Sequence, residues 1–340
     1  MNSKSLNNFD LLRLFAAVQV MLGHGINQFH AESLGWLEYF LEYFPGVPIF
    51  FIISGYLIGG AFSRKRTLKE FYINRTLRIF PGLYASIILS IIIIFIFGIN
   101  VGVWDFSLWL FSQLFMLQSY DPVFFNDFGV GKMNPPLWTI AVEVQFYLLV
   151  PILFLFFKRS ISFIVWVLVA LILAKEANNF MHANDYFIGK IYNLTAMPHI
   201  YLFFIGAYLS TRKDIVEKYF MGKFHYWLGV YLTSLLLGSF FNIETQSNWQ
   251  AAFLSILLGF LALSFAYSGA NFLTKFSPKN DLSYGVYIYH YILINVIYEM
   301  GYDGWQGVVF LSIATFFIAL TSWKFIELPF INMKRKVRSE

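Results

Sequence analysis

The chain has 340 residues, of which 58% are hydrophobic and 13% are charged, and its mean hydropathy is +0.62. Soluble domains average about 25% charged residues, so the composition excludes an ordinary soluble protein and predicts a membrane protein. The chain lacks cysteine, which excludes disulfides, thiolate metal sites and a cysteine nucleophile, and its net charge of +5 lies in short clusters between apolar runs, which argues against nucleic acid as a partner.

Apolar runs of about 17 to 25 residues, bounded by polar loops, predict ten membrane-spanning helices. The runs are 9–29, 44–63, 79–99, 136–157, 160–175, 196–211, 226–242, 249–268, 284–301 and 305–326. The segment 106–118 is also apolar, but as a helix it covers about 20 Å, less than the roughly 30 Å hydrocarbon core. We therefore expect an all-α, polytopic transmembrane helix bundle in a single domain, residues 1–340, with 106–118 interfacial or re-entrant.

The charges between these runs test the choice of spans. If 106–118 does not cross, one side of the membrane receives most of the Lys and Arg residues, and the other receives almost only Lys132, Lys175 and Lys190. Because cytoplasmic loops carry the excess of Lys and Arg, both termini are predicted to be cytoplasmic. The first run has a polar interior and no small-x-small cleavage site, so we expect it to be retained rather than removed as a signal peptide.

The first run carries three ionisable residues on one helical face. His24 follows Arg13 by eleven residues and Asp10 by fourteen. Eleven steps of about 100° return to within about 20° of the starting direction. A charged side chain at the centre of a span costs roughly 2.5 to 3.5 kcal/mol, so we expect these residues to serve a function.

The second run contains Gly55 and Gly59, a small-xxx-small pair that lets another helix approach closely. Ser54 stands directly before this pair. Because no Gly-x-Ser-x-Gly elbow surrounds it, we expect Ser54 to form a hydrogen bond between helices rather than to act as a nucleophile.

At the cytoplasmic edge of the third run, directly before it, Arg75 and Arg78 are three residues apart. On a helix they present their guanidinium groups side by side, a geometry suited to phosphate or pyrophosphate oxygens. The alternative is a positive anchor on anionic lipid head groups, and the spacing alone favours that anchor.

The fourth run begins with two prolines, which suit a helix start, and continues with Thr139, Glu143 and Tyr147 on one face. At 1.5 Å per residue, Glu143 lies about 10 Å and His24 about 8 Å inside the outer boundary. A carboxylate beside an imidazole fixes its tautomer and stabilises its protonated form. We therefore favour a functional His24–Glu143 pair over the alternative, in which Glu143 pairs with an arginine or a hydroxyl group only to hold helices together.

The ninth run is rich in tyrosine, as expected of an aromatic belt at a membrane interface. His290 lies about 9 Å inside the cytoplasmic boundary by helix rise. The sequence leaves open whether it is a structural partner or a substrate contact. The other histidines lack an H-x-x-x-H spacing, so we expect no metal site; they are His30, His182, His199 and His225.

Taken together, these segments resemble the acyltransferase-3 family of integral membrane O-acyltransferases over nearly the whole chain. Six family motifs occur in the family's order, at Asp10 to Arg13 with His24, Phe50 to Ile58, Arg75 to Pro81, Trp138 to Tyr147, Ser283 to His290 and Glu327 to Pro329. Thr139 replaces the usual Ser, and Val144 stands where many members have a second acid. The chain resembles the standalone form, without the hydrolase-like domain that many members carry.

This resemblance implies a bacterial inner-membrane enzyme that moves an acyl group, commonly acetyl, from cytoplasmic acyl-CoA to a hydroxyl of a glycan or glycolipid, such as O-antigen or exopolysaccharide. Membrane lipids and acyl-CoA are the expected partners, with no permanently bound cofactor. His24 is expected to remove the hydroxyl proton or to carry the acyl group, while Glu143 orients it. The expected substrate and donor contacts are Asp10, Arg13, Arg75, Arg78, Trp138, Thr139, Tyr147, Tyr287 and His290. The acceptor, the acyl length, the choice between the two routes and the oligomeric state stay open.

Two other classes of protein compete with this interpretation. Ten helices also fit a secondary transporter built as an inverted repeat with ionisable residues at midplane. However, the motifs gather in the first half and in the ninth run, without a matching pattern in the other half. A scaffold for glycan assembly would not need polar residues lined along the first helix.

Overall fold

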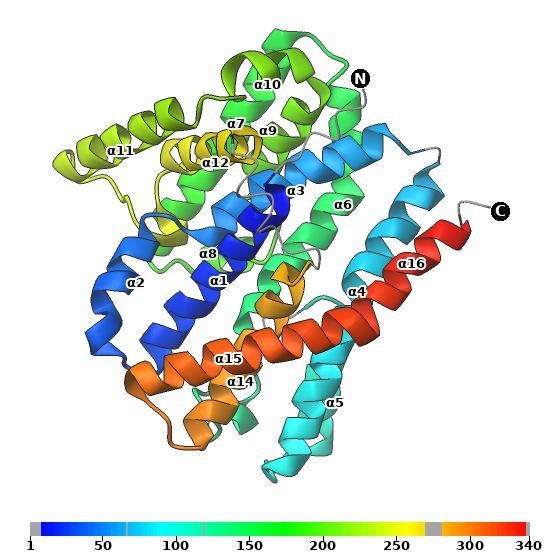
Figure 1. The fold of residues 1–340 in the computed structure, drawn as a ribbon, viewed down its shortest axis with the longest axis vertical. Coiled ribbons are helices and arrows are strands. Elements are labelled where there is room, and N and C mark those ends of the chain that lie inside the picture. Colours follow the sequence, from blue (N-terminus) through cyan, green and yellow to red (C-terminus); the bar gives the residue numbers. More distant parts are fainter. Residues whose placement is uncertain (1–7, 66, 118–119, 269–280, 338–340) are drawn as a thin grey trace. The chain divides into compact units, whose positions relative to one another are not determined.

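The structure is a computed structural model that describes residues 8–65, 67–117, 120–268 and 281–337, and within these ranges it contains helices and no strand (Figure 1). The α-helices are α1 (Phe9–Gln28), α2 (Gly35–Glu42), α3 (Gly46–Ser63), α4 (Leu68–Ile96), α5 (Val103–Leu114), α6 (Trp138–Phe156), α7 (Ile161–Ala183), α8 (Phe187–Tyr192), α9 (Ile200–Thr211), α10 (Lys213–Tyr219), α11 (Phe224–Phe240), α12 (Ala252–Ser268), α14 (Ser283–Glu299), α15 (Gly304–Ser322) and α16 (Leu328–Val337). The all-α prediction is confirmed.

Each predicted span coincides with a helix, and the ends differ most at α4 and α7. Helix α4 begins at Leu68, well before the apolar run, because the Thr67 side chain accepts a hydrogen bond from the Glu70 amide (3.0 Å) and caps the helix. Arg75 and Arg78 therefore lie on a helix, as predicted. Helix α5 covers most of the segment 106–118, whose last residue lies outside the described residues.

Several of these helices are long and apolar enough to cross a membrane. Within the described residues six stretches meet this description: Phe9–Gln28, Glu32–Ser63, Leu68–Ile96, Pro135–Phe156, Ile161–Ala183 and Gly304–Met333. Two further apolar helices, α9 and α12, are shorter. The number of crossings and the side of each terminus stay predictions.

The internal contacts of the chain divide it into two compact units. Unit 1 comprises residues 1–16, 42–66 and 142–279. Its core is the contact of α3 with α9, where a Cβ added to Gly55 would lie 2.8 Å from Phe203 Cα, and one added to Gly206 would lie 2.8 Å from the Tyr56 amide nitrogen. The prediction that Gly55 and Gly59 admit a close helix is thus confirmed. Helices α11 and α12 lie side by side in the same unit (Figure 1).

Unit 2 comprises residues 17–41, 67–141 and 280–340, and α14 forms its core. Nearly every residue of α14 is buried, although many of its side chains are tyrosine, histidine or asparagine. Helix α14 packs on α15 and α4, and at Gly82 of α4 an added Cβ would lie 2.6 Å from the Tyr284 ring. The loop before α6 is fixed to α14 by side-chain amides, because Asn295 donates to the carbonyl of Lys132 (2.9 Å) and Asn134 donates to that of Ile288 (2.9 Å).

Candidate functional site

Two histidines from distant parts of the sequence meet inside unit 2. His24 Nδ1, on α1, lies 3.0 Å from His290 Nε2, on α14. The ring planes differ by 15° and the ring centroids are 5.3 Å apart. A ring nitrogen lies little more than about 1 Å from the centre of its imidazole ring. With the two nitrogens 3.0 Å apart, a centroid distance of 5.3 Å is therefore close to the largest possible, and it requires both nitrogens to lie near the line that joins the ring centres. The contact is therefore an in-plane hydrogen bond rather than a face-to-face stack.

Each helix holds its histidine in a fixed position. The end of α1 is tied to α15, since the Gly304 amide donates to the Phe29 carbonyl (2.6 Å) and a Cβ on Gly25 would lie 2.7 Å from the Leu311 side chain. His290 has no exposed surface, and its Nδ1 lies 2.7 Å from the Tyr287 carbonyl and 3.2 Å from that of Val286. His24 is partly exposed, so the pair consists of one buried, anchored ring and one partly exposed ring.

Tyrosines of α14 surround the two rings and connect them to the start of α6. Tyr291 stands edge-on to His24, with the ring centroids 5.4 Å apart. The Tyr287 hydroxyl donates to the Pro136 carbonyl (3.1 Å) and accepts from Thr139 Oγ1 (2.8 Å). The structure thus brings together four predicted site residues, which are His24, Thr139, Tyr287 and His290. Trp138, the residue before Thr139, begins α6.

Glu143 lies in unit 1, where two hydroxyl groups bind the same carboxylate oxygen. Tyr147 donates to Glu143 Oε1 at 2.8 Å, and Ser54, on α3, donates to it at 3.3 Å. Glu143 is only 7% exposed. The prediction that Ser54 forms a hydrogen bond between helices is confirmed, and Glu143 and Tyr147 lie on one face of α6, as their spacing of four predicts. His24 and Glu143 belong to different units, and their pairing stays a prediction.

The predicted donor residues on α1 lie in its first half, within unit 1. The Arg13 guanidinium lies over the Phe50 ring of α3, 5.7 Å from its centroid, and Asp10 is exposed. This cation–π contact holds the stem of Arg13 against α3. The roles of both residues in donor binding stay predictions.

Arg78 of α4 forms an ion pair with Asp281, which precedes α14. Its guanidinium also lies 5.8 Å from the ring centroid of Trp323, in a π-helical turn that follows α15 (Trp323–Glu327). Arg75 lies almost one turn earlier on α4. This partner was not predictable from the sequence, because Asp281 is a single loop acid 203 residues away from Arg78.

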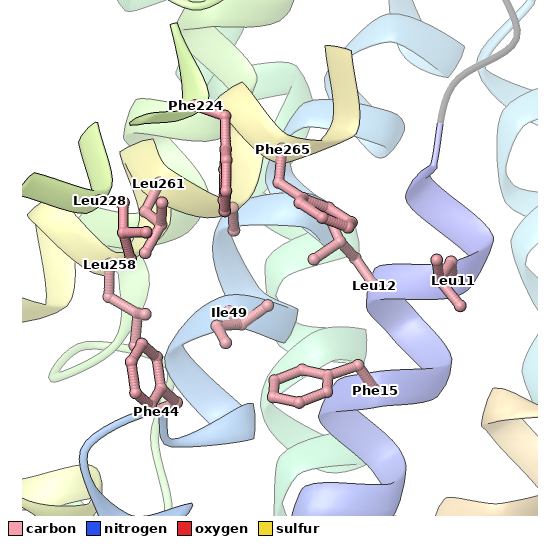
Figure 2. Close-up of a pocket in the computed structure, with 11 residues that line it drawn as sticks. Leu11, Leu12, Phe15, Phe44, Ile49, Phe224, Leu228, Leu258, Leu261 and Phe265 are labelled. Atoms are coloured by element: carbon pink, nitrogen blue, oxygen red, sulfur yellow. The ribbon is translucent and has the colours of Figure 1, made fainter. Parts of the chain in front are cut away.

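Unit 1 also contains a cavity of about 370 Å³ between α1, α3, α11 and α12 (Figure 2). Its lining is wholly apolar and consists of Leu11, Leu12, Phe15, Phe44, Ile49, Phe224, Leu228, Leu258, Leu261, Ala262 and Phe265. Such a lining suits a hydrocarbon chain, but it supplies no group that transfers a proton or polarises a carbonyl. The cavity is therefore not a candidate for the catalytic groups. Within the described residues, no three His, Asp or Glu side chains stand close enough to hold a metal ion.

The sequence analysis missed Tyr291, which contacts His24, and Asn134, which binds the helix that carries His290. Tyr291 was assigned to the aromatic belt, although its position directly after His290 was a usable signal. Asn134 carried no signal of its own, because a polar residue before a helix is ordinarily a cap. Here its side chain instead binds the carbonyl of Ile288 on α14.

These features define an integral membrane protein in which a buried imidazole contacts a partly exposed one. Sequence comparison assigns its family: the model of the acyltransferase-3 family, described as an acyltransferase domain, matches residues 6–324. The chain belongs to this family and is an acyltransferase. No solved structure matches the chain.

Curated relatives agree with this assignment. The chain is 32% identical over 354 residues to nodulation protein 10 of Rhizobium leguminosarum bv. viciae, covering 96% of this chain and 94% of that protein. It is 28% identical over 348 residues to the O-acetyl transferase of Shigella phage Sf6, covering 96% of each. It is 24% identical over 368 residues to peptidoglycan O-acetyltransferase OatA of Listeria monocytogenes, covering 96% of this chain but 56% of that protein's length.

Proposed function

We propose that this acyltransferase is an O-acetyltransferase that moves an acetyl group from cytoplasmic acetyl-CoA to a hydroxyl of a surface glycan or glycolipid. The contact of His24 Nδ1 with His290 Nε2, 3.0 Å long, carries the proposal. An imidazole held at one nitrogen and open at the other is the usual general base for a hydroxyl group. The name of the phage relative supports O-acetyl transfer, and that of the Listeria relative supports a glycan acceptor.

The proposed topology has ten crossings, both termini in the cytoplasm of a bacterial cell and the inner membrane as the location. It is supported by a helix at each predicted span and by the distribution of Lys and Arg between the spans. We also propose that residues 1–340 form one catalytic domain, because the family match extends through both compact units. Arg13 then lies at the cytoplasmic end of α1, and His24 follows about 16 Å further along the helix.

The reaction follows from this arrangement. Arg13, Arg75 and Arg78 bind the phosphates of acetyl-CoA, and its extended thioester arm reaches toward His24. His24 takes the proton of the acceptor hydroxyl, whose oxygen attacks the thioester carbonyl, or His24 first accepts the acetyl group itself. In either route the C–S bond breaks, the CoA thiolate leaves and takes up the proton, and an ester forms. The remaining predicted contacts are Asp10, Trp138, Thr139, Tyr147 and Tyr287.

A reconstitution assay tests the proposed function. The purified protein is placed in liposomes with acetyl-CoA labelled in the acetyl group, and candidate glycans and glycolipids are supplied on either side. The expected result is an alkali-labile label on the acceptor that requires the protein. If the labelled acetyl group is released only as free acetate, and no class of acceptor becomes labelled on a hydroxyl group, the proposed acceptor is wrong. Uptake of intact substrate without ester formation would favour a transporter.

Replacing Glu143 with glutamine is expected to lower the rate of acetyl transfer by about 10²-fold, the lower end of general acid–base effects, because the negative charge of the carboxylate is proposed to stabilise the protonated form of His24. The amide oxygen still accepts from Tyr147 and Ser54, so the fold is expected to persist. Label transfer in liposomes gives the rate. The exposed Glu32→Gln is the matched control, and a wild-type rate for Glu143→Gln would leave this carboxylate with a packing role only.

Replacing Arg78 with glutamine is expected to raise the KM for acetyl-CoA about ten- to a hundredfold and to leave kcat unchanged, since a hydrogen bond to a charged phosphate contributes about 1.5 to 3 kcal/mol. Initial rates against acetyl-CoA concentration provide both constants. Asp281→Asn is the control, because it removes the ion pair but keeps the guanidinium group. If both variants change KM equally, or neither does, Arg78 serves as an anchor and not as a donor contact.

A further inference from the structure

The surroundings of the buried Nδ1 of His290 determine whether that nitrogen carries a proton. It faces two backbone carbonyl oxygens, of Tyr287 at 2.7 Å and of Val286 at 3.2 Å. A carbonyl oxygen only accepts hydrogen bonds, so a bare Nδ1 would set two lone pairs against each other in a site without water access. His290 Nδ1 therefore carries a proton.

The charge of His290 follows from its surroundings. Its side chain has no exposed surface, and its polar contacts among the described residues are the two carbonyls and His24, with no carboxylate. A buried imidazolium without a counter-ion is costly, and more so inside a membrane. His290 is therefore neutral, and a neutral imidazole that is protonated on Nδ1 has a lone pair on Nε2.

The tautomer of His24 follows from that of His290. The lone pair of His290 Nε2 points at His24 Nδ1, 3.0 Å away and in the plane of both rings. Only a protonated Nδ1 makes this contact a hydrogen bond. His24 is thus held as the Nδ1–H form, and its lone pair lies on Nε2, the nitrogen that does not face His290.

We infer that His290 is a positioning residue rather than a substrate contact, and that Nε2 of His24 is the nitrogen that reacts. The inference rests on the proposed function, for which it names the reacting atom. The acceptor O–H gives its proton to His24 Nε2 while its oxygen bonds to the thioester carbon. The C–S bond breaks, the CoA thiolate leaves, and the proton on Nε2 passes to that thiolate. His24 Nδ1–H stays bound to His290 throughout.

A histidine in this position has an advantage over a carboxylate. It fixes the tautomer of His24, as a carboxylate does, but it brings no permanent charge into the membrane. When His24 becomes positively charged, the lone pair of His290 still accepts its Nδ1–H. The two carbonyls that hold His290 Nδ1–H are oriented to stabilise positive charge that spreads onto the second ring.

Nitrogen-15 NMR of the protein in liposomes tests the tautomer without any measurement of activity. The chain has six histidines, so labelling them and comparing wild type with His24→Gln and His290→Gln assigns the signals. We expect a protonated Nδ1 and a bare Nε2 on both His24 and His290. A protonated Nε2 on His24, or an imidazolium at His290, overturns the inference.

Kinetics of two His290 variants test the positioning role. The side-chain oxygen of His290→Gln still accepts from His24 Nδ1–H, whereas His290→Leu offers no acceptor. We expect kcat to fall about 10²-fold in the leucine variant and clearly less in the glutamine variant, with KM for donor and acceptor unchanged in both. Equal loss in both variants, or a loss confined to KM, contradicts positioning. If His24→Ala itself is fully active, the proposed function fails, whatever tautomer the NMR spectra show.

Discussion

Replacing His24 with alanine is expected to lower kcat for acetyl transfer by about 10²- to 10⁴-fold, the range that a general base contributes. The reason is chemical, because the variant lacks the nitrogen that takes the hydroxyl proton, while the helix around it is retained. Initial rates of label transfer from acetyl-CoA to a glycan acceptor in liposomes measure the effect. KM for acetyl-CoA is expected to change little, because the proposed phosphate contacts lie elsewhere on the chain.

The control for this variant is His225→Ala, which removes an exposed histidine at the start of α11 and is expected to leave the rate unchanged.

Added imidazole is expected to restore part of the rate of His24→Ala but not that of His290→Leu, in which the base His24 is still present. Incubation of wild type with donor alone separates the two chemical routes, since an acetylated protein accumulates only if His24 carries the acetyl group. A wild-type rate for His24→Ala would exclude both routes.

The sequence pointed to His24 through the cost of a polar residue in a membrane helix, but it did not indicate that His290 is its partner. Counting along the apolar runs placed His24 about 8 Å from the outer boundary and His290 about 9 Å from the cytoplasmic one. Such depths would separate them by a large part of the hydrocarbon core, yet their nitrogens are 3.0 Å apart. The count assumes that lipid sets the ends of each helix. Helix α14 is enclosed by protein along nearly its whole length, so its register depends on α4 and α15 instead.

The helices at the ten predicted spans were predictable because each has an apolar run, which hydropathy detects. Short helices such as α10 and α16 have no such run and were not predicted. Polar extensions such as Leu68 to Arg78 lack this signal, although Thr67 and Glu70 have the spacing of a capping box that marks the start of α4. Partners that come from loops far along the chain had no signal, as with Asp281 and Arg78. Motif positions gave the candidate residues, and tertiary packing decided which of them meet.

Unit 1 depends on the close approach of α3 and α9 at Gly206. Replacing Gly206 with alanine is expected to destabilise the protein by more than about 3 kcal/mol, beyond the usual cost of an added methyl group in a packed core. The added Cβ would lie 2.8 Å from the Tyr56 amide nitrogen and would also meet the Ile52 carbonyl. These are backbone atoms of α3, which cannot rotate away as a side chain does. The contact of α3 with α9 must therefore open along its length.

Gly229→Ala is the matched control, because this glycine lies inside α11 of the same unit and an added Cβ meets nothing within 4 Å. Alanine there is expected to raise the free energy of unfolding by up to about 1 kcal/mol through its higher helix propensity. Denaturant titration in detergent micelles, followed by circular dichroism, measures both variants. The same change, glycine to alanine, is thus expected to lower the free energy of unfolding at Gly206 and to raise it at Gly229. This difference in sign separates the effect of helix–helix packing from that of helix propensity. Equal stability of Gly206→Ala and wild type would mean that α3 and α9 do not approach each other through their glycines.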